Sequence, residues 1–250
     1  VLAVAHLTDL HIQPELAAAE GLAKCLQRVQ SLPVKPGLVI TGGDLVMDAF
    51  DAGFDRAKTQ FDLVTSVFKA ECSLPVRHCL GNHDIFGWNK TKSKTTGTEK
   101  GWGKAWACEA FGLSKPWYSF EQAGWHFIIL DSVAPNGEGY IGRLLPEQMD
   151  WLKQDLASAK GKPVCVVSHI PVLSMCAVVG DGAVKQDMWR TPGASMHADG
   201  SELHRMFCEA GNVKLCLSGH IHLNDRVELG PRGGAADGPK VTYICDGAVC

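Results

Sequence analysis

The first eighty residues alternate between short apolar runs and longer amphipathic segments, and this alternation restricts the possible folds strongly. Strand-like runs occupy residues 1–8, 38–41 and 76–80. The segments 15–31 and 54–70 between them carry apolar residues at helical spacing. A strand–helix–strand–helix–strand order calls for a mostly parallel sheet covered by helices. The sequence therefore predicts an α/β architecture.

The remaining residues predict more strands and helices of the same kind. Residues 117–120 and 125–130 flank Gln122-Ala123-Gly124 and indicate a β-hairpin that begins a second sheet. We expect helices at 145–159 and 201–210, strands at 164–167 and 214–217, and further strands up to the C-terminus. Because no linker or shift in composition interrupts the chain, we predict a single domain over residues 1–250.

Two long segments interrupt this rhythm, at 85–116 and 170–199. The first holds Lys90, Lys92, Lys94 and Lys100 among threonines and glycines, together with three tryptophans, whose large rings need a surface to pack against. We expect a cap loop over the site at 85–116, with a helix near 102–111, and a second long loop at 170–199. The alternative for the first segment is a surface excursion that packs on its own tryptophans.

Polar side chains follow five of the strand-like runs. They form the motifs Thr8-Asp9-Leu10-His11, Gly42-Gly43-Asp44, Gly81-Asn82-His83-Asp84, Ser168-His169 and Gly219-His220-Ile221-His222. Strand ends of a mostly parallel sheet lie at one edge, so these loops can converge. Two of the motifs contain a pair of polar residues spaced by two. In extended backbone such pairs point the same way, so each pair could hold one ion from one side.

Carboxylate, imidazole and amide donors suit manganese, iron or zinc. The motifs offer more donors than one ion needs, and two ions about 3.5–4 Å apart that share Asp44 would use them all. Such a pair makes hydroxide from water at neutral pH and holds the oxygens of a displacement at phosphorus. His83 would then reach the phosphoryl oxygen or the leaving group, while Asp84 fixes its ring. The alternative makes His83 a ligand and Asn82 structural.

The five motifs, in this order, resemble those of the calcineurin-like metallophosphoesterases. The resemblance spans Asp9 to His222 and implies an α/β (α+β) four-layer sandwich of two mixed β-sheets flanked by helices. It implies two divalent or trivalent metal ions and His83 as the catalytic histidine. The implied ligands are Asp9, His11, Asp44 and His222 for the first ion, and Asp44, Asn82, His169 and His220 for the second.

Within that family, Trp117-Tyr118-Ser119-Phe120 and the stretch from His126 to Ser132 are similar to the class III cyclic-nucleotide phosphodiesterases. Met47 stands where purple acid phosphatases have a tyrosine ligand, so we do not expect tyrosinate-bound iron. The resemblance therefore implies a hydrolase of small phosphodiesters, cyclic nucleotides among them, or of phosphomonoesters.

Two other functions fit the same fold. A catalytically silent protein-binding scaffold is disfavoured, because such proteins usually lose a ligand or the catalytic histidine and this chain keeps all of them. A nuclease would need a basic groove, whereas the formal net charge is −3 and only the lysines at 90–100 form a local exception. We expect no nucleic-acid partner. No apolar run reaches the roughly 18–20 residues of a membrane span, and the oligomeric state is open.

The cysteines and the chain ends bear on the cellular compartment. The ten cysteines include no CxxC pair, and we expect mostly reduced, buried thiols. The chain starts at Val1 with a strand-like run. Either a leader was removed or the sequence was cut from a longer one, and we expect a missing piece after Cys250 as well. The compartment is therefore open between the cytoplasm and export.

Several other histidines, tryptophans and arginines are also candidate site residues. His6, His78 and His126 lie in strand-like runs and His204 in a predicted helix, so we expect structural roles for all four. His197 either lines the substrate pocket or is exposed on its loop. Trp88 and Trp189 either stack on a nucleobase or fill the core. Arg143 and Arg226 are expected to be solvated charges.

Overall fold

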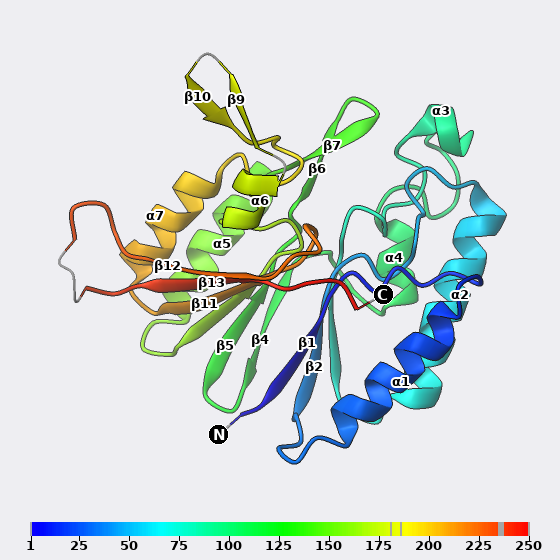
Figure 1. Cartoon of the computed structure of the whole chain (residues 1–250), viewed down its shortest axis with the longest axis horizontal. Coiled ribbons are helices and arrows are strands. Elements are labelled where there is room, and N and C mark those ends of the chain that lie inside the picture. Colours follow the sequence, from blue (N-terminus) through cyan, green and yellow to red (C-terminus); the bar gives the residue numbers. More distant parts are fainter. Residues whose placement is uncertain (1, 181, 186, 235–237, 250) are drawn as a thin grey trace. The chain divides into compact units, whose positions relative to one another are not determined.

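The computed structural model describes residues 2–180, 182–185, 187–234 and 238–249. The chain forms two compact units (Figure 1). Unit 1 comprises Val1–Pro116, Pro135–Gly139 and Ala248–Cys250, and unit 2 comprises Trp117–Ala134 and Tyr140–Gly247. Each unit contains its own sheet with flanking helices, which confirms the α/β class. A single domain over residues 1–250 stays a prediction.

Unit 1 is built on a three-stranded parallel sheet in the order β1-β2-β3. Its strands are β1 (Val4–Leu7), β2 (Leu38–Gly42) and β3 (Val76–Cys79), joined by helices α1 (Ala18–Gln30) and α2 (Phe54–Glu71). Both helices pack on one face of the sheet, because Leu26, Phe61 and Val39 belong to the same buried apolar cluster. The predicted strand–helix–strand–helix–strand order is confirmed.

The segment 85–116 contains two short helices, α3 (Lys90–Ser93) and α4 (Ala105–Ala110). The second lies within the predicted helical stretch. The Trp106 ring packs against Phe54, Phe61 and Phe86, with ring centroids 4.8, 5.3 and 5.0 Å away. Since Phe54 and Phe61 belong to α2, Trp106 fixes this segment to the core of unit 1. Its role as a cap over the site stays a prediction.

Unit 2 is built on a six-stranded mixed sheet in the order β12-β13-β11-β8-β5-β4. Four central strands are parallel, and each edge strand is antiparallel to its neighbour. In chain order the strands are β4 (Tyr118–Gln122), β5 (Trp125–Ile129), β8 (Val164–Val167), β11 (Val213–Ser218), β12 (Asp225–Leu229) and β13 (Val241–Cys245). The hairpin β4–β5 belongs to this second sheet, as predicted.

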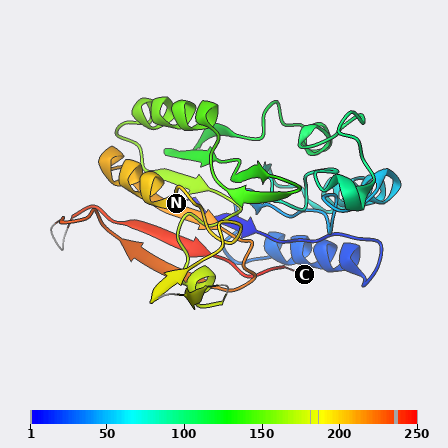
Figure 2. The same cartoon turned by 90° about the horizontal axis from the view of Figure 1, so that it is seen from above.

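Helices α5 (Pro146–Ser158) and α7 (Gly200–Ala210) cover one face of the six-stranded sheet (Figure 2). Leu152 of α5, Phe207 of α7 and Val166 of β8 are all buried in one apolar cluster. Helix α5 begins with Pro146, which fits a first turn because proline lacks the N–H that would be unsatisfied there. Both helices were predicted to within one residue of their observed ends.

Short elements in unit 2 and at its boundary were not predicted. Strands β6 (Val133–Asn136) and β7 (Gly139–Gly142) pair with each other. The expected loop at 170–199 instead contains α6 (Met175–Gly180) and the antiparallel pair β9 (Ala183–Lys185) and β10 (Met188–Arg190). Strands β9 and β10 are exposed at every residue, so no apolar run or alternation marks them in the sequence.

The nine described cysteines are all free thiols, as expected. Four of them are buried and five are only partly buried, so the expected burial holds for fewer than half. Burial raises the pKa of the Cys165 thiol to about 12, because a thiolate loses its hydration there. In the part of the chain that the structure describes, no helix has both the length and the apolar character needed to cross a bilayer.

Candidate metal centre

The first two motifs lie on neighbouring loops of unit 1 that extend the pairing of β1 with β2. The Asp9 N–H donates to the Gly43 carbonyl and the His11 N–H to the Asp44 carbonyl, both at 3.0 Å. Asp9, His11 and Asp44 have φ values of 54°, 45° and 51°. The expected extended backbone at Asp9 and His11 is therefore wrong. These residues adopt left-handed conformations, which set the direction of their side chains. Such conformations are costly for residues other than glycine.

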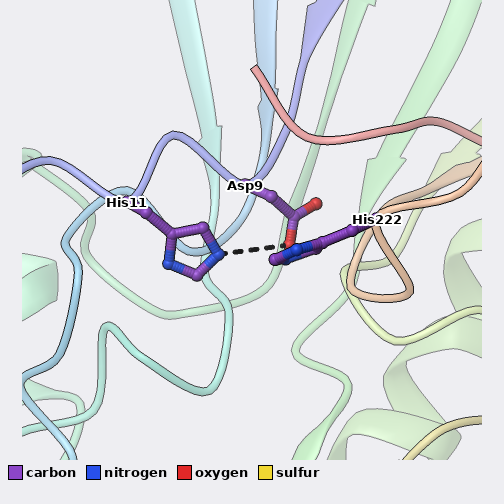
Figure 3. A group of neighbouring side chains, drawn as sticks. All are labelled: Asp9, His11 and His222. Carbon is purple, nitrogen blue, oxygen red and sulfur yellow. Dashed lines mark ion pairs between the residues drawn. The ribbon is translucent and has the colours of Figure 1, made fainter. Parts of the chain in front are cut away.

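The three side chains converge and are buried. His11 Nε2 lies 3.9 Å from Asp9 Oδ1 (Figure 3) and 4.0 Å from Asp44 Oδ2. Asp9, His11 and Asp44 are 0%, 6% and 2% exposed. These distances exceed a hydrogen bond but suit groups that share an ion. Two buried carboxylates beside an imidazole form a donor set that fits a divalent cation such as manganese, iron or zinc.

The Gly81–Asp84 turn is tied to the same loops by the Asp84 carboxylate. Its Oδ1 accepts the N–H groups of Leu45 at 2.8 Å and Val46 at 3.1 Å, and its Oδ2 accepts the Gly81 N–H at 2.8 Å. Asp84 is fully buried. It therefore holds the loop after β2 against the loop after β3, a role that the sequence did not indicate. Its expected contact with the His83 ring stays a prediction.

His83 and Asn82 lie in the same turn. The His83 backbone N–H donates to Asp44 Oδ1 at 2.8 Å, and its ring meets the His11 ring edge-on with centroids 5.0 Å apart. His11, Asp44 and His83 each offer a ligand atom, and these atoms lie within 4.8 Å of one another. Asn82 is buried. Within unit 1, His83 is thus placed where it could either bind a metal or act beside one.

The three remaining candidate ligands belong to unit 2. His169 follows β8, and His220 and His222 follow β11. His220 Nδ1 lies 3.2 Å from His169 Nε2. His220 Nε2 lies 2.9 Å from the Ala194 carbonyl, which can only accept, so Nε2 carries the proton. In neutral His220, Nδ1 then keeps the lone pair that a metal ligand needs, while the Ala194 carbonyl fixes the tautomer.

His220 and His222 have positive φ values, as Asp9 and His11 of the first motif do. Their φ values are 72° and 58°, so this pair is also left-handed and not extended as expected. Among the described residues, ten other than glycine have a positive φ, and five of them are candidate metal ligands. Strained backbone of this kind concentrates at functional sites.

Sequence reasoning missed the residues that support these side chains. Gly81 leaves room for the Asp44 carboxylate, and Thr8 Oγ1 donates to Asp9 Oδ2 at 2.7 Å. In unit 2, Ser132 and Ser168 bond the turn that carries His169. Gly81, Thr8 and Ser168 belong to the motifs, so their position in the sequence could have indicated a supporting role. Ser132 lies 37 positions before His169, so only the fold reveals its role.

Three histidines outside the five motifs have structural partners. His126 Nε2 lies 2.7 Å from Asp155 Oδ2, and His204 contacts the Tyr243 hydroxyl at 2.7 Å. His78 packs between the Phe68 and Phe111 rings, and burial lowers its pKa to about 4. The expected structural roles of these three are confirmed.

The exposure of His197, the two tryptophans and the two arginines can be compared with expectation. The His197 side chain is fully buried, so an exposed loop histidine is wrong. Trp189 is 62% exposed on β10, so it does not fill the core. Trp88 meets Phe50 edge-on. Arg226 is exposed and pairs with Glu228, and Arg143 is exposed as well, in line with solvated charges.

Comparisons with known proteins show which sequences and which fold this chain resembles. The chain is 28% identical over 228 residues to a probable cyclic nucleotide phosphodiesterase from Synechococcus sp., covering 88% of this chain and 73% of that protein. Its fold matches a dimetal phosphatase from Danio rerio with a TM-score of 0.66 at 15% identity, over 100% of this chain and 88% of that one.

The sequence model described as "Calcineurin-like phosphoesterase" matches residues 2–224, which include all the candidate site residues of both units. The expected fold class and the expected enzyme class are thereby confirmed. The chain belongs to the calcineurin-like phosphoesterase family, and it is a metal-dependent hydrolase of phosphoric esters.

Proposed function

We propose that this protein hydrolyses small phosphodiesters, with phosphomonoesters as a second substrate class, at a dinuclear metal centre. The proposed ligands are Asp9, His11, Asp44, Asn82, His169, His220 and His222. The observation that carries the proposal is the backbone of Asp9, His11, Asp44, His220 and His222. These five residues make up half of the described non-glycine residues with positive φ, although they lie on three separate loops.

The donor sets divide between two ions. Asp9, His11 and His222 would hold the first ion, and Asn82, His169 and His220 the second. Asp44 would bridge them, since its carboxylate has two oxygens and is buried beside His11. When bound, two such cations supply Lewis acidity and offset the negative charge that develops on the phosphoryl group.

His83 is proposed to move a proton at the reacting phosphate ester. Its backbone N–H is fixed by Asp44 Oδ1, which sets the start of the side chain next to the proposed bridging ligand. A histidine at that place can donate a proton to the leaving oxygen, a contribution of about 10²–10⁴-fold in rate. The grouping of His83 with His11 and Asp44 also supports the alternative, in which His83 is a ligand.

The substrate proposal rests on the relatives. The matching Synechococcus protein is named a probable cyclic nucleotide phosphodiesterase. We therefore propose 3′,5′-cyclic nucleotides as the first natural substrates to examine. An exposed Trp189 in the segment between His169 and His220 offers a ring on which a base could stack.

The decisive experiment combines metal analysis with a panel of substrates. Protein loaded with manganese is expected to hydrolyse bis-p-nitrophenyl phosphate, and the panel adds p-nitrophenyl phosphate, 3′,5′-cyclic AMP and single-stranded DNA. Asn82→Ala and His169→Ala should each abolish most of the activity. Arg226→Ala, which removes an exposed side chain of unit 2, is the control that should retain it.

Each outcome has a meaning for the proposal. Full activity in Asn82→Ala or His169→Ala would reject the ligand assignment. No hydrolysis by metal-loaded wild type would favour the scaffold, and preferred cleavage of DNA would favour the nuclease. The role of His83 is decided separately. If His83→Gln keeps two metals per chain and loses rate, His83 is a proton donor; if it loses one metal, His83 is a ligand.

A further inference from the structure

The turn that carries His169 is held by several hydrogen bonds within unit 2. The Ser168 hydroxyl donates to the Ile170 carbonyl at 2.8 Å, and the Ile170 N–H donates to Ser132 Oγ at 3.0 Å. The Ser168 N–H donates to the Leu217 carbonyl at 3.0 Å. The orientation of His169 therefore depends on where the Ser168 and Ser132 hydroxyls are fixed.

A buried histidine from a distant part of the chain contacts this turn. His197 Nε2 lies 3.1 Å from Ser168 Oγ, and the His197 backbone N–H donates to the Pro171 carbonyl at 2.9 Å. On the other side of its ring, His197 Nδ1 lies 2.7 Å from Asp199 Oδ1. The His197 side chain has no exposure to solvent and that of Asp199 is 11% exposed.

The donors and acceptors around His197 bear on the protonation state of its ring. The Ser168 hydroxyl has one hydrogen. With that hydrogen donated to the Ile170 carbonyl, 2.8 Å away, Ser168 Oγ accepts from His197 Nε2. Asp199 Oδ2 accepts the Leu144 N–H at 2.9 Å, and Asp199 Oδ1 is an acceptor for His197 Nδ1. In this arrangement both ring nitrogens act as donors, which neutral imidazole cannot do.

The surroundings of Asp199 are consistent with an ionised carboxylate. Burial by itself raises the pKa of Asp199. The hydrogen bond and charge of His197, together with the Leu144 N–H, outweigh this effect and lower the pKa from its ordinary value. A carboxylate is thus available as the partner of a charged ring.

We infer that His197 is a buried imidazolium paired with Asp199, and that it is a positioning residue for His169. The pair fixes the Ser168 hydroxyl from one side, while Ser132 fixes the Ile170 N–H from the other. Buried ion pairs of this kind contribute geometric specificity more than stability. The inference rests on the proposed function only in taking His169 as a metal ligand.

The protonation state is tested by nitrogen NMR of the zinc-loaded, full-length protein labelled with ¹⁵N-histidine. At pH 7 the two ring nitrogens of His197 should both show the shift of protonated nitrogen, and the signals should be absent in His197→Gln. A neutral ring, with a proton on Nδ1 only, would mean that Ser168 donates to His197 and would overturn the inference. This measurement needs no activity.

The positioning role is tested by metal affinity. His197→Gln keeps a donor but has no charge, and zinc titration should show one of the two sites weakened by about 10–100-fold, the usual effect of losing a partner of a ligand. His204→Gln is the matched control. His204 also has partners at both ring nitrogens in unit 2, namely the Tyr243 hydroxyl and the Gly230 carbonyl, yet its bonds do not reach the His169 turn.

The remaining outcomes separate the inference from the proposed function. If wild type binds no metal, the proposed function fails, and the NMR result still decides the proton on His197. If wild type binds two ions and His197→Gln loses no more affinity than His204→Gln, the positioning role is rejected. If His197→Gln does not fold, Ser168→Ala replaces it, because this change removes the acceptor and should weaken the same site.

Discussion

Gly81 and Asp44 approach so closely that no side chain fits between them. An ideal Cβ on Gly81 would lie 2.1 Å from Asp44 Oδ1 and 2.4 Å from the Asp44 backbone nitrogen. Gly81→Ala must therefore displace the proposed bridging carboxylate or the β2 loop. We expect loss of bound metal and a fall in the free energy of unfolding of about 2 kcal/mol or more, within the range of overpacking defects. Elemental analysis and urea unfolding measure both.

Gly21 provides the matched control for this substitution. It lies in α1, and an added Cβ would meet nothing within 4 Å. Because alanine is the better helix former, Gly21→Ala should raise stability by about 0.5–1 kcal/mol and leave metal content unchanged. Equal metal content in Gly81→Ala and Gly21→Ala would show that the close approach does not matter for the site.

Asp84→Asn should destabilise unit 1, because an amide offers one acceptor oxygen where the carboxylate uses two. Either the Gly81 N–H or the N–H groups of Leu45 and Val46 would lose their partner. A buried N–H left without a partner costs about 1–3 kcal/mol, and we expect that fall in the free energy of urea unfolding. Asp62→Asn removes a 64% exposed carboxylate paired with Lys58, and it should change stability by less than about 0.5 kcal/mol.

The stability of the protein should depend on His78 between about pH 6.5 and pH 4. Burial lowers the pKa of His78 from 6.5 to about 4, with a smaller effect from the charge of Arg77. In that window the unfolded state binds the proton and the folded state does not, so stability is lost as the pH falls. The loss from this residue reaches about 3 kcal/mol near pH 4 and stays constant below it.

His78→Gln isolates this contribution from that of the other titrating groups. Urea unfolding of wild type and variant from pH 7 to pH 4 should show wild type losing more stability than the variant. The difference between the two free energies should therefore change across the window. Parallel curves would contradict the neutral state of His78 in the folded protein.

Much of the fold could be predicted from the sequence, because long helices have a clear hydrophobic period and buried strands are continuous apolar runs. Helices α2, α5 and α7 and strand β8 were predicted to within one residue at each end. Strands β9 and β10 were missed because all their described residues are exposed, so no alternation of buried and exposed positions marks them. Pattern reasoning therefore detects elements that pack on a core and misses those that do not.

The candidate site was also predictable only in part from the sequence. The motifs indicated the candidate ligands, because they contain residue types that bind metals. The Asp9–His11 spacing does not reflect extended backbone, because both residues have left-handed φ values, which leave no trace in the sequence. The link from His197 to Ser168 spans 29 positions, so it depends on tertiary structure alone.

Removing metal should lower the thermal stability of the wild-type protein. Bound ions stabilise the folded state by RT ln(1 + [L]/Kd), which is about 3–4 kcal/mol at 100–1,000 times Kd. Without ions, the buried Asp9 and Asp44 carboxylates also lose a source of positive charge. We expect excess EDTA to lower the Tm of wild type and of the control Asp62→Asn by the same amount. Asp44→Asn, which alters the proposed bridge, should show a much smaller shift, and an equal shift in all three proteins would place the stabilising metal elsewhere.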